Sequence, residues 1–316
     1  MSSTSQKNIA IVGVGGIGTH ILRALVATNL ANVVALTRST TVHPHHHHYL
    51  HLHSHEQQHS SPPRKTLPSD LSSVSLIEAD YNNVPAVTAI FKEHDIEIVI
   101  STVPAAGLHA QYTLADAAKA SGTVKLFVPS EWGLPSEGAS HRGEDNTFGI
   151  KDGLSAHLRT LGLPYTRFFT GFFIGYLPWF VGIDTNHVVN VIGKGETPFS
   201  VTSEEDIGGF VAHVLTTVPS SSPHLKNQCL RIQGDRITMR DLARIYHKPL
   251  EFVPEGDEVP AKTPEEAALK TFLQIEADGG MASTGWDRLT ETERGDAGSA
   301  NWLWEGHVWK RVEDSI

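Results

Sequence analysis

Cysteine is almost absent from this chain, which has Cys229 alone among 316 residues. No disulfide can form within the chain and no cysteine-based zinc site can be built, as is typical of proteins in a reducing compartment. Apolar runs long enough to span a membrane are also missing. The first apolar stretch of the chain, "IAIVGVGGIG", is too short and too glycine-rich for a signal peptide. We therefore expect a cytoplasmic protein with no membrane partner.

An excess of positive charge is lacking as well. The net charge is -10, and residues 251–316 alone contain six Lys or Arg against fifteen Asp or Glu. A protein that binds nucleic acid usually presents a basic surface to the phosphates. We therefore expect no nucleic-acid partner, and we interpret the acidic end as solvated surface.

The first half of the chain alternates short β-branched runs with longer segments of helical periodicity. This order predicts a doubly wound α/β fold, in which a parallel sheet is covered by helices on both faces. The expected strands are 8–12, 33–37, 74–79, 96–102 and 124–130, and the expected helices between them are 18–29, 84–94 and 108–122.

The expected organisation is a dinucleotide-binding Rossmann domain over residues 6–165 and a smaller α+β substrate region over 166–316. Parts of the second region are expected to extend the Rossmann sheet. Residues 39–73 interrupt the strand–helix rhythm and are predicted to be a loop insertion.

The insertion contains "HPHHHHYLHLHSHEQQH" at 43–59, with nine of the nineteen histidines. A specific metal site needs two to four ligands at fixed positions with oriented partners. The run has no apolar face to fix such geometry, so we predict no specific metal site. Metal binding or storage by this tract is the weaker alternative.

Glycines follow the first expected strand in the spacing G-x-G-x-x-G. In that pattern Gly13 permits the tight turn, Gly15 lets the backbone approach a pyrophosphate, and Gly18 lets helix and strand pack closely. A purely structural glycine turn is the alternative. The predicted cofactor contacts in this part of the chain are Gly13, Gly15, Gly16, Ile17, Gly18, Thr102 and Val103.

The second expected strand ends in "ALTRST", with Arg38 where an NAD site usually has an acidic residue. A guanidinium can bind the 2'-phosphate of NADP in a bidentate manner. The pattern therefore favours NADPH, although a solvated loop cation would also explain Arg38.

The chain resembles the isoflavone reductase and phenylcoumaran benzylic ether reductase family, atypical short-chain dehydrogenases within the NmrA-like group. The similarity lies in the glycine turn, the strand ending in Arg38, "VKLFVPSEWG" at 124–133, "NTFGIKDGLSAHLRTLGLPYT" at 146–166 and "SEEDIGGFVAHVL" at 203–215. The resemblance implies a Rossmann fold, NADPH as cofactor and a small-molecule substrate.

The resemblance also implies that Lys151 is the catalytic general acid or base and contacts the cofactor ribose. Partial burial beside a nicotinamide would lower the lysine pKa toward neutrality, which suits that role. A helix lysine that points to solvent is the alternative. The chain departs from the family at Ser155, where an arginine is common. A basic residue of the 2'-phosphate loop also has no aligned counterpart, and Lys65 or Arg64 is the candidate to replace it.

Three further candidates have simpler explanations. His109 lies near the expected nicotinamide position, but a surface histidine is more common there. The aromatic run 167–180 suits a pocket wall and a core equally well. Glu131 and Asp206 have no evident carboxylate partner for hydrolytic acid–base chemistry.

These observations predict an NADPH-dependent reductase of a small aromatic or conjugated molecule, with hydride from the nicotinamide and Lys151 as proton donor or acceptor. The alternative is a non-catalytic, NAD(P)-binding redox sensor of the NmrA-like type. The sequence leaves the oligomeric state and the identity of the substrate open.

Overall fold

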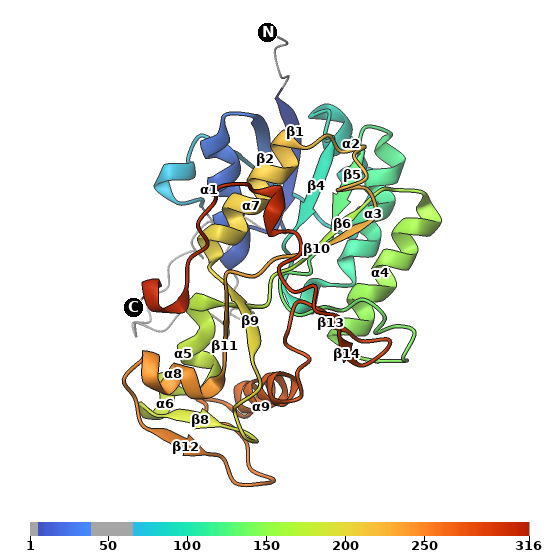
Figure 1. Cartoon of the computed structure of the whole chain (residues 1–316). Helices are drawn as coiled ribbons and strands as arrows, with labels where there is room; N and C mark the ends of the chain where they lie inside the picture. The colour runs from blue at the N-terminus through green and yellow to red at the C-terminus, as the bar shows by residue number, and fades with distance from the viewer. Residues whose placement is uncertain (1–5, 39–65, 316) are drawn as a thin grey trace, which may run out of the picture.

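A parallel five-stranded sheet forms the centre of the protein (Figure 1). The computed structural model describes residues 6–38 and 66–315, so the histidine tract, Arg64 and Lys65 lie outside the described residues. The strand order is β3-β2-β1-β4-β5. These strands are β1 (Lys7–Val12), β2 (Ala31–Thr37), β3 (Ser75–Glu78), β4 (Ile98–Ser101) and β5 (Leu126–Val128).

Each strand of this sheet pairs with its neighbour in parallel, and β1 lies between β2 and β4. The chain order reverses between β1 and β4, which creates a crevice at their carboxyl ends. The doubly wound parallel sheet predicted from the sequence is confirmed.

The helices cover the sheet on both faces, and each face has its own apolar core. Helices α1 and α7 pack together on one face, while α2, α3 and α4 pack on the other. The helices are α1 (Gly16–Thr28), α2 (Val84–Glu93), α3 (Ala110–Ser121), α4 (Thr147–Leu161), α5 (Leu177–Phe180), α6 (Ile183–Asn186), α7 (Glu204–Thr217), α8 (Met239–Ile245) and α9 (Pro264–Asp278).

The remaining strands are short and belong to several small sheets. They are β6 (Thr166–Phe169), β7 (Phe172–Phe173), β8 (Val189–Val191), β9 (Phe199–Thr202), β10 (Gln228–Arg231), β11 (Asp235–Ile237), β12 (Leu250–Phe252), β13 (Trp286–Asp287) and β14 (Thr292–Glu293).

Strand β6 runs beside the central sheet, because Phe127 of β5 forms a parallel bridge with Tyr165 and β10 pairs with β6. Helices α5, α6, α8 and α9 gather with β8 and β12 in a smaller group at the bottom of Figure 1. A third apolar core fills this group. The proposed division at residue 165 therefore falls immediately before a strand that continues the sheet.

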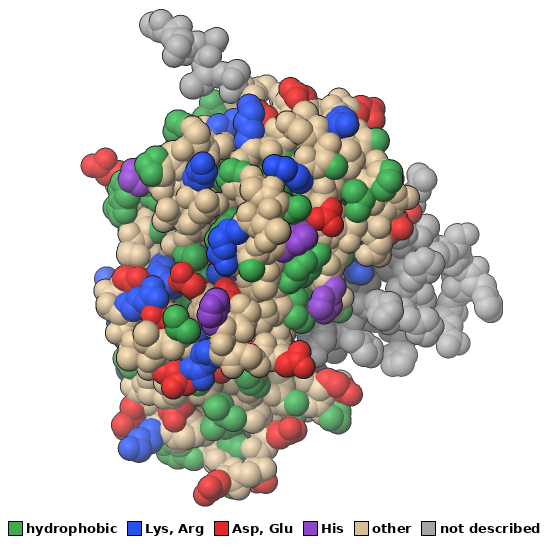
Figure 2. Space-filling model, turned by 90° about the vertical axis from the view of Figure 1, so that its right-hand side faces the viewer, with side chains coloured by type: hydrophobic (Ala, Val, Ile, Leu, Met, Phe, Trp, Pro, Cys, Tyr) green, Lys and Arg blue, Asp and Glu red, His purple; other side chains and the backbone are tan. Residues whose placement is uncertain are grey.

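Side chains of both charges are interspersed on the face shown in Figure 2. Among the helices of residues 6–38 and 66–315, none has the length and apolar character to cross a membrane. Within the same residues, no group of three His, Cys, Asp or Glu is placed to hold a metal ion.

Helix α4 begins at a side-chain cap. Asn146 has extended backbone angles, and its Oδ1 accepts hydrogen bonds from the amides of Phe148 and Gly149 at 2.8 and 3.2 Å. Such a cap satisfies amides that have no partner within the helix. The cap fixes where the helix that carries Lys151 begins.

Replacing Asn146 by Ala is expected to lower the free energy of unfolding by about 1 kcal/mol, because two helix amides lose their acceptor. The matched variant Asn146→Asp keeps an acceptor oxygen and should lie close to the wild type. Urea denaturation of the three proteins measures the difference. Equal stability of the Ala and Asp variants would show that the cap contributes nothing.

Candidate active site

The glycine turn after β1 is held together by close backbone contacts. Gly13 has a φ of +91°, and a Cβ there would lie 3.1 Å from the carbonyl oxygen of Thr102. A Cβ on Gly18 would overlap the carbonyl oxygen of Gly13 and the hydroxyl of Thr102. Packing within the protein therefore requires glycine at both positions.

Gly15 differs from the other two glycines. Among residues 6–38 and 66–315, no heavy atom beyond its chain neighbours lies within 4 Å of the position that its Cβ would take. Gly15 is also the N-cap of α1, and no side chain in the described part of the chain caps the amides there. The open space and the free amides fit a phosphate group that approaches the backbone, which is the cofactor role predicted for Gly15, Gly16 and Ile17.

Thr102 and Val103 follow β4 and connect the glycine turn to the next strand end. The Thr102 hydroxyl donates hydrogen bonds to the carbonyl oxygens of Gly13 and Val12, the latter at 3.3 Å. The Val103 carbonyl accepts a hydrogen bond from the Ser130 hydroxyl at 2.8 Å. The hydroxyl of Thr102 thus stabilises the turn itself, and its predicted contact with the cofactor stays a prediction.

Arg38 is exposed directly after β2, at the edge of the sheet that also carries the glycine turn. Two residues earlier, the carbonyl of Leu36 accepts hydrogen bonds from the Gly13 amide and the Tyr81 hydroxyl, both at 2.9 Å. Burial raises the pKa of Tyr81, and the nearby charge of Arg38 opposes that shift. Tyr81 was not among the site residues expected from the sequence.

Lys151 lies on α4, beside the loop that follows β5. Its Nζ donates a hydrogen bond to the carbonyl oxygen of Glu131 at 2.6 Å. Burial lowers the pKa of Lys151; the carboxylate of Glu131 opposes this shift, and the positive charge of Arg167 adds to it. The side chain is therefore held in place and disposed to release its proton more readily than an exposed lysine.

A buried network of charged groups adjoins Lys151 through Glu131. Arg167 on β6 has 2% of its surface exposed, and its Nε pairs with Glu131 Oε1 at 2.7 Å. Its Nη1 pairs with Asp152 Oδ1 at 3.1 Å, and its Nη2 donates to the Ser136 hydroxyl at 2.6 Å. Ser136 in turn donates to Glu131 Oε2 at 2.7 Å, so every group of the network has a partner.

The network favours the charged forms of Asp152 and Arg167. Burial favours the neutral form of Asp152, but hydrogen bonds from Ser140 and the charge of Arg167 lower its pKa overall. Burial also opposes the charge of Arg167, while Glu131 raises its pKa. No carboxylate partner was evident for Glu131 from the sequence. In the structure Asp152 pairs with the same guanidinium, and Arg167 engages both carboxylates.

Trp132 of the PSEWG segment has an unusual backbone conformation, with a φ of +39°. A bulky residue in this region is strained, and such strain persists only where the surroundings hold it. The indole Nε1 donates to the carbonyl of Ser101 at 2.8 Å, and the ring stacks on Phe168 with centroids 5.6 Å apart. These contacts fix the path of the loop that presents the Glu131 carbonyl to Lys151.

Arg288 connects the C-terminal region to the residues around the start of α4. Its guanidinium lies 3.7 Å from the centre of the Phe148 ring, and its Nε donates to the Pro135 carbonyl at 2.6 Å. Glu276 and Glu144 pair with the same guanidinium. Arg288 therefore ties α9 to the start of α4.

The other sequence candidates are either exposed or have a structural role. His109 is exposed at the start of α3. Ser155 is buried and donates to the Asp152 carbonyl at 2.7 Å, so no guanidinium stands there. In the aromatic run, Phe168, Phe169 and Phe180 are core residues.

Asp206 belongs to a separate contact on α7. Its Oδ1 lies 2.9 Å from His307 Nε2, and its Oδ2 accepts a hydrogen bond from the Lys310 amide at 2.8 Å. These contacts attach the C-terminal segment to α7. Asp206 therefore has a structural role, remote from Lys151 in the network of contacts.

A family model described as the NmrA-like family matches residues 5–277. The chain belongs to the NmrA-like family. This finding confirms the resemblance predicted from the glycine turn, the PSEWG segment and the Lys151 segment.

Curated relatives include reductases. The chain is 26% identical to isoflavone reductase homolog P3 of Arabidopsis thaliana over 287 residues, covering 87% of this chain and 83% of the relative. It is 31% identical to oxidoreductase BOA1 of Botryotinia fuckeliana over 192 residues, which cover 56% of this chain and 61% of that protein.

Solved structures share the fold of this NmrA-like chain. Leucoanthocyanidin reductase of Vitis vinifera in complex with NADPH superposes with a TM-score of 0.72 and 19% identity, covering 98% of this chain and 97% of the other. A mutant NmrA superposes with a TM-score of 0.68 and 17% identity, covering 98% and 94%.

Removing the Arg167 charge is expected to destabilise the protein by about 3–5 kcal/mol, because Glu131 and Asp152 would remain buried without their cation. Urea denaturation of Arg167→Met measures the loss. The control is Arg23→Met, which removes the exposed ion pair with Asp70 and should change the midpoint very little. Similar midpoints for the two variants would contradict the importance of the buried network.

Proposed function

We propose that this protein is an NADPH-dependent reductase of a small aromatic or conjugated molecule. One observation carries the proposal, namely an unbroken series of contacts across the carboxyl ends of β1, β4 and β5. Thr102 bonds to Gly13, Ser130 bonds to Val103, and Lys151 bonds to Glu131, the residue after Ser130. A proton-exchanging side chain is thereby joined to a dinucleotide-binding turn.

The cofactor contacts are distributed along this edge. Gly15 and the backbone amides of Gly16 and Ile17 would hold the pyrophosphate, and Arg38 would hold the 2'-phosphate. Val103 and Lys151 would contact the nicotinamide end. The open space at Gly15 and the exposure of Arg38 support this placement, because neither is used by packing within the described residues.

Bound NADPH supplies the hydride in such a reaction. The part of Lys151 is to exchange the balancing proton and to hydrogen-bond the cofactor ribose. Its lowered pKa supports that part, since a proton donor works best when its pKa is near the working pH. The carbonyl of Glu131 orients the ammonium.

The aromatic substrate class rests on relatives. Their names include phenylcoumaran benzylic ether reductase of Pinus taeda and pinoresinol reductase of Arabidopsis thaliana. The partly buried Phe172 and Phe173 and the exposed Phe272 offer flat apolar surface in the C-terminal half. Aromatic rings of a substrate would stack on such surface.

A non-catalytic dinucleotide sensor is the second candidate, and the likeness to NmrA favours it. The position of Lys151 favours the enzyme, because a sensor needs the dinucleotide contacts but no oriented proton donor. Turnover separates the two functions.

The Arg38→Ala variant is expected to bind NADPH up to about a hundredfold more weakly, since loss of a charge-assisted phosphate contact costs about 1–3 kcal/mol. Its affinity for NADH should not change. Fluorescence titration with both dinucleotides gives the ratio, and Arg244→Ala, an exposed arginine on α8, is the control. An unchanged ratio of affinities in Arg38→Ala would disprove the 2'-phosphate contact.

Lys151→Met is expected to fold and bind NADPH but to lose about 10²-fold to 10⁴-fold in turnover, because the positioned proton donor is gone. Lys151→Arg keeps the charge but cannot exchange a proton near neutrality, so it should be equally slow. Turnover on a panel of conjugated aromatics, with melting temperature and NADPH affinity, tests this. The control is Lys119→Met on α3; full activity of Lys151→Met would refute the role.

The pH profile gives an independent readout of the same group. A proton donor works in its charged form, so the rate falls as the pH rises through its pKa. Because the pKa of Lys151 is lowered, this fall should occur below the range of an ordinary lysine. The fall should be absent from the residual activity of Lys151→Arg. A wild type that binds NADPH but reduces no compound of the panel would support the sensor.

A further inference from the structure

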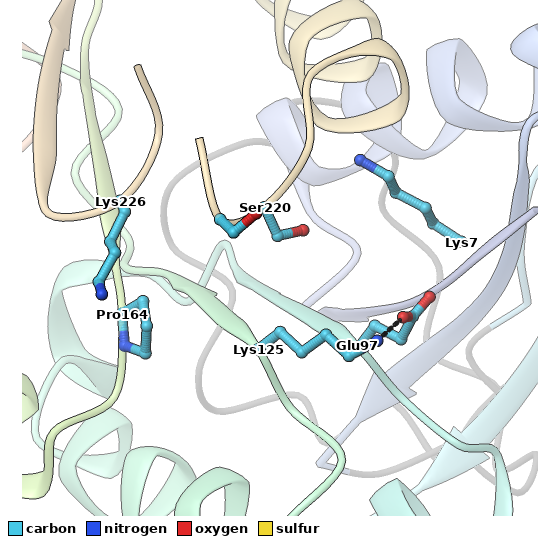
Figure 3. A pocket seen from close by; sticks show the side chains of 7 residues that line it. Lys7, Glu97, Lys125, Pro164, Ser220 and Lys226 are labelled. Carbon is cyan, nitrogen blue, oxygen red and sulfur yellow. Dashed lines mark hydrogen bonds and ion pairs between the residues drawn. The ribbon is translucent and has the colours of Figure 1, made fainter. Parts of the chain in front are cut away.

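A cavity of about 390 Å³ lies at the opposite edge of the sheet from the glycine turn (Figure 3). Lys7 begins β1, and Glu97, Lys125 and Pro164 directly precede β4, β5 and the segment that leads into β6. These are amino ends of strands, whereas the cofactor contacts lie at carboxyl ends. Its lining residues are Lys7, Glu97, Lys125, Pro164, Ser220, Ser221 and Lys226.

Positive charge exceeds negative charge around this cavity. Three lysines line it, and Glu97 is the one carboxylate among its lining residues. Lys125 pairs with Glu97, which uses that carboxylate. The Nζ of Lys7 donates to the carbonyl oxygens of Leu215 and Val218 at 2.7 Å each, at the end of α7.

Lys226 and the two serines provide donors that the protein itself does not use. Within the described residues, no hydrogen bond or ion pair involves the ammonium of Lys226 or the hydroxyls of Ser220 and Ser221. Figure 3 shows Ser220 between Lys226 on one side and Lys7 on the other. These unused donors all come from the segment between α7 and β10, which lines the cavity together with Lys7 and Lys125.

The lysines in this cavity also repel one another. Lys7 is partly buried, and burial lowers its pKa; Glu97 opposes the shift, while the charge of Lys125 adds to it. An anion in the cavity would be attracted by every lysine and would offset this repulsion. Ammonium and hydroxyl groups are both donors to phosphate oxygens.

We propose that this cavity binds a phosphate dianion, either free or as a small phosphate monoester. The cavity has room for a ligand of that size. Lys226 and the serines bind it directly, and Lys7 and Lys125 attract it. The site is independent of the proposed cofactor, because the two lie at opposite edges of the sheet.

Binding of inorganic phosphate to the full chain tests the proposal, by isothermal titration at constant ionic strength. Reversing a charge in Lys226→Glu should weaken binding at least about tenfold, since attraction becomes repulsion. Glu97→Gln removes the one carboxylate of the cavity and should strengthen binding about threefold. Lys194→Glu is the control, because Lys194 is exposed in the loop before β9 and has no ion pair with any described residue; its affinity should not change. Melting temperatures check that each variant folds.

Opposite changes in phosphate affinity, a decrease in Lys226→Glu and an increase in Glu97→Gln, would identify the cavity as the binding site. Phosphate that binds elsewhere, including at Arg38, would be insensitive to both Lys226 and Glu97. Equal affinities of wild type, Lys226→Glu and Glu97→Gln, or no binding to the wild type, would overturn the proposal. Glycerol 3-phosphate distinguishes a monoester from free phosphate, and tighter binding of succinate than of either would exclude phosphate as the ligand class.

Discussion

The buried ion pair between Arg167 and Glu131 is the interaction on which the rest of the site depends. Taking two charges out of water is costly, so the pair persists only because Ser136 and Asp152 satisfy the remaining donor and acceptor groups. The pair joins β6 to the loop after β5, and Asp152 joins both to α4. Lys151 is the neighbour of Asp152 in the chain and bonds to the backbone of Glu131, so the network sets its position. Burial at that position lowers the pKa of Lys151, and Glu131 and Arg167 modify the shift in opposite directions.

The carboxyl ends and the amino ends of the strands in the central sheet offer different groups to a ligand. At the carboxyl ends, the chain reverses order between β1 and β4 and leaves an open approach to Gly15. At the amino ends, Lys7 is drawn to the free carbonyls at the end of α7, as cations are at helix C-termini. Lys125 lies near Lys7 because its ammonium forms an ion pair with Glu97. The same sheet thus creates one edge suited to a dinucleotide and another with surplus positive charge.

The fold could be predicted because its signals are local. Strand runs and helical periodicity are properties of neighbouring residues, and the glycine spacing records contacts within one turn. The network around Arg167 could not be predicted in this way, because its partners Glu131 and Asp152 lie 36 and 15 positions away in the chain. One signal was present: an arginine inside the aromatic strand "YTRFF" is unusual, and where such a guanidinium is buried it needs carboxylates. Tyr81 gave no such signal, because its partner Leu36 lies 45 positions earlier in the chain.

The central claim is that Lys151 is a proton-exchanging group beside the nicotinamide, and a direct titration of its ammonium tests it. ¹³C NMR of the reductively methylated protein, with the Lys151 signal assigned by its absence in Lys151→Arg, gives the pKa of that group. The account predicts a pKa below that of an ordinary lysine, 10.5, and a change of the signal on adding NADP⁺ but not 2',5'-ADP, which lacks the nicotinamide. An ordinary lysine pKa together with the same response to both ligands would contradict it.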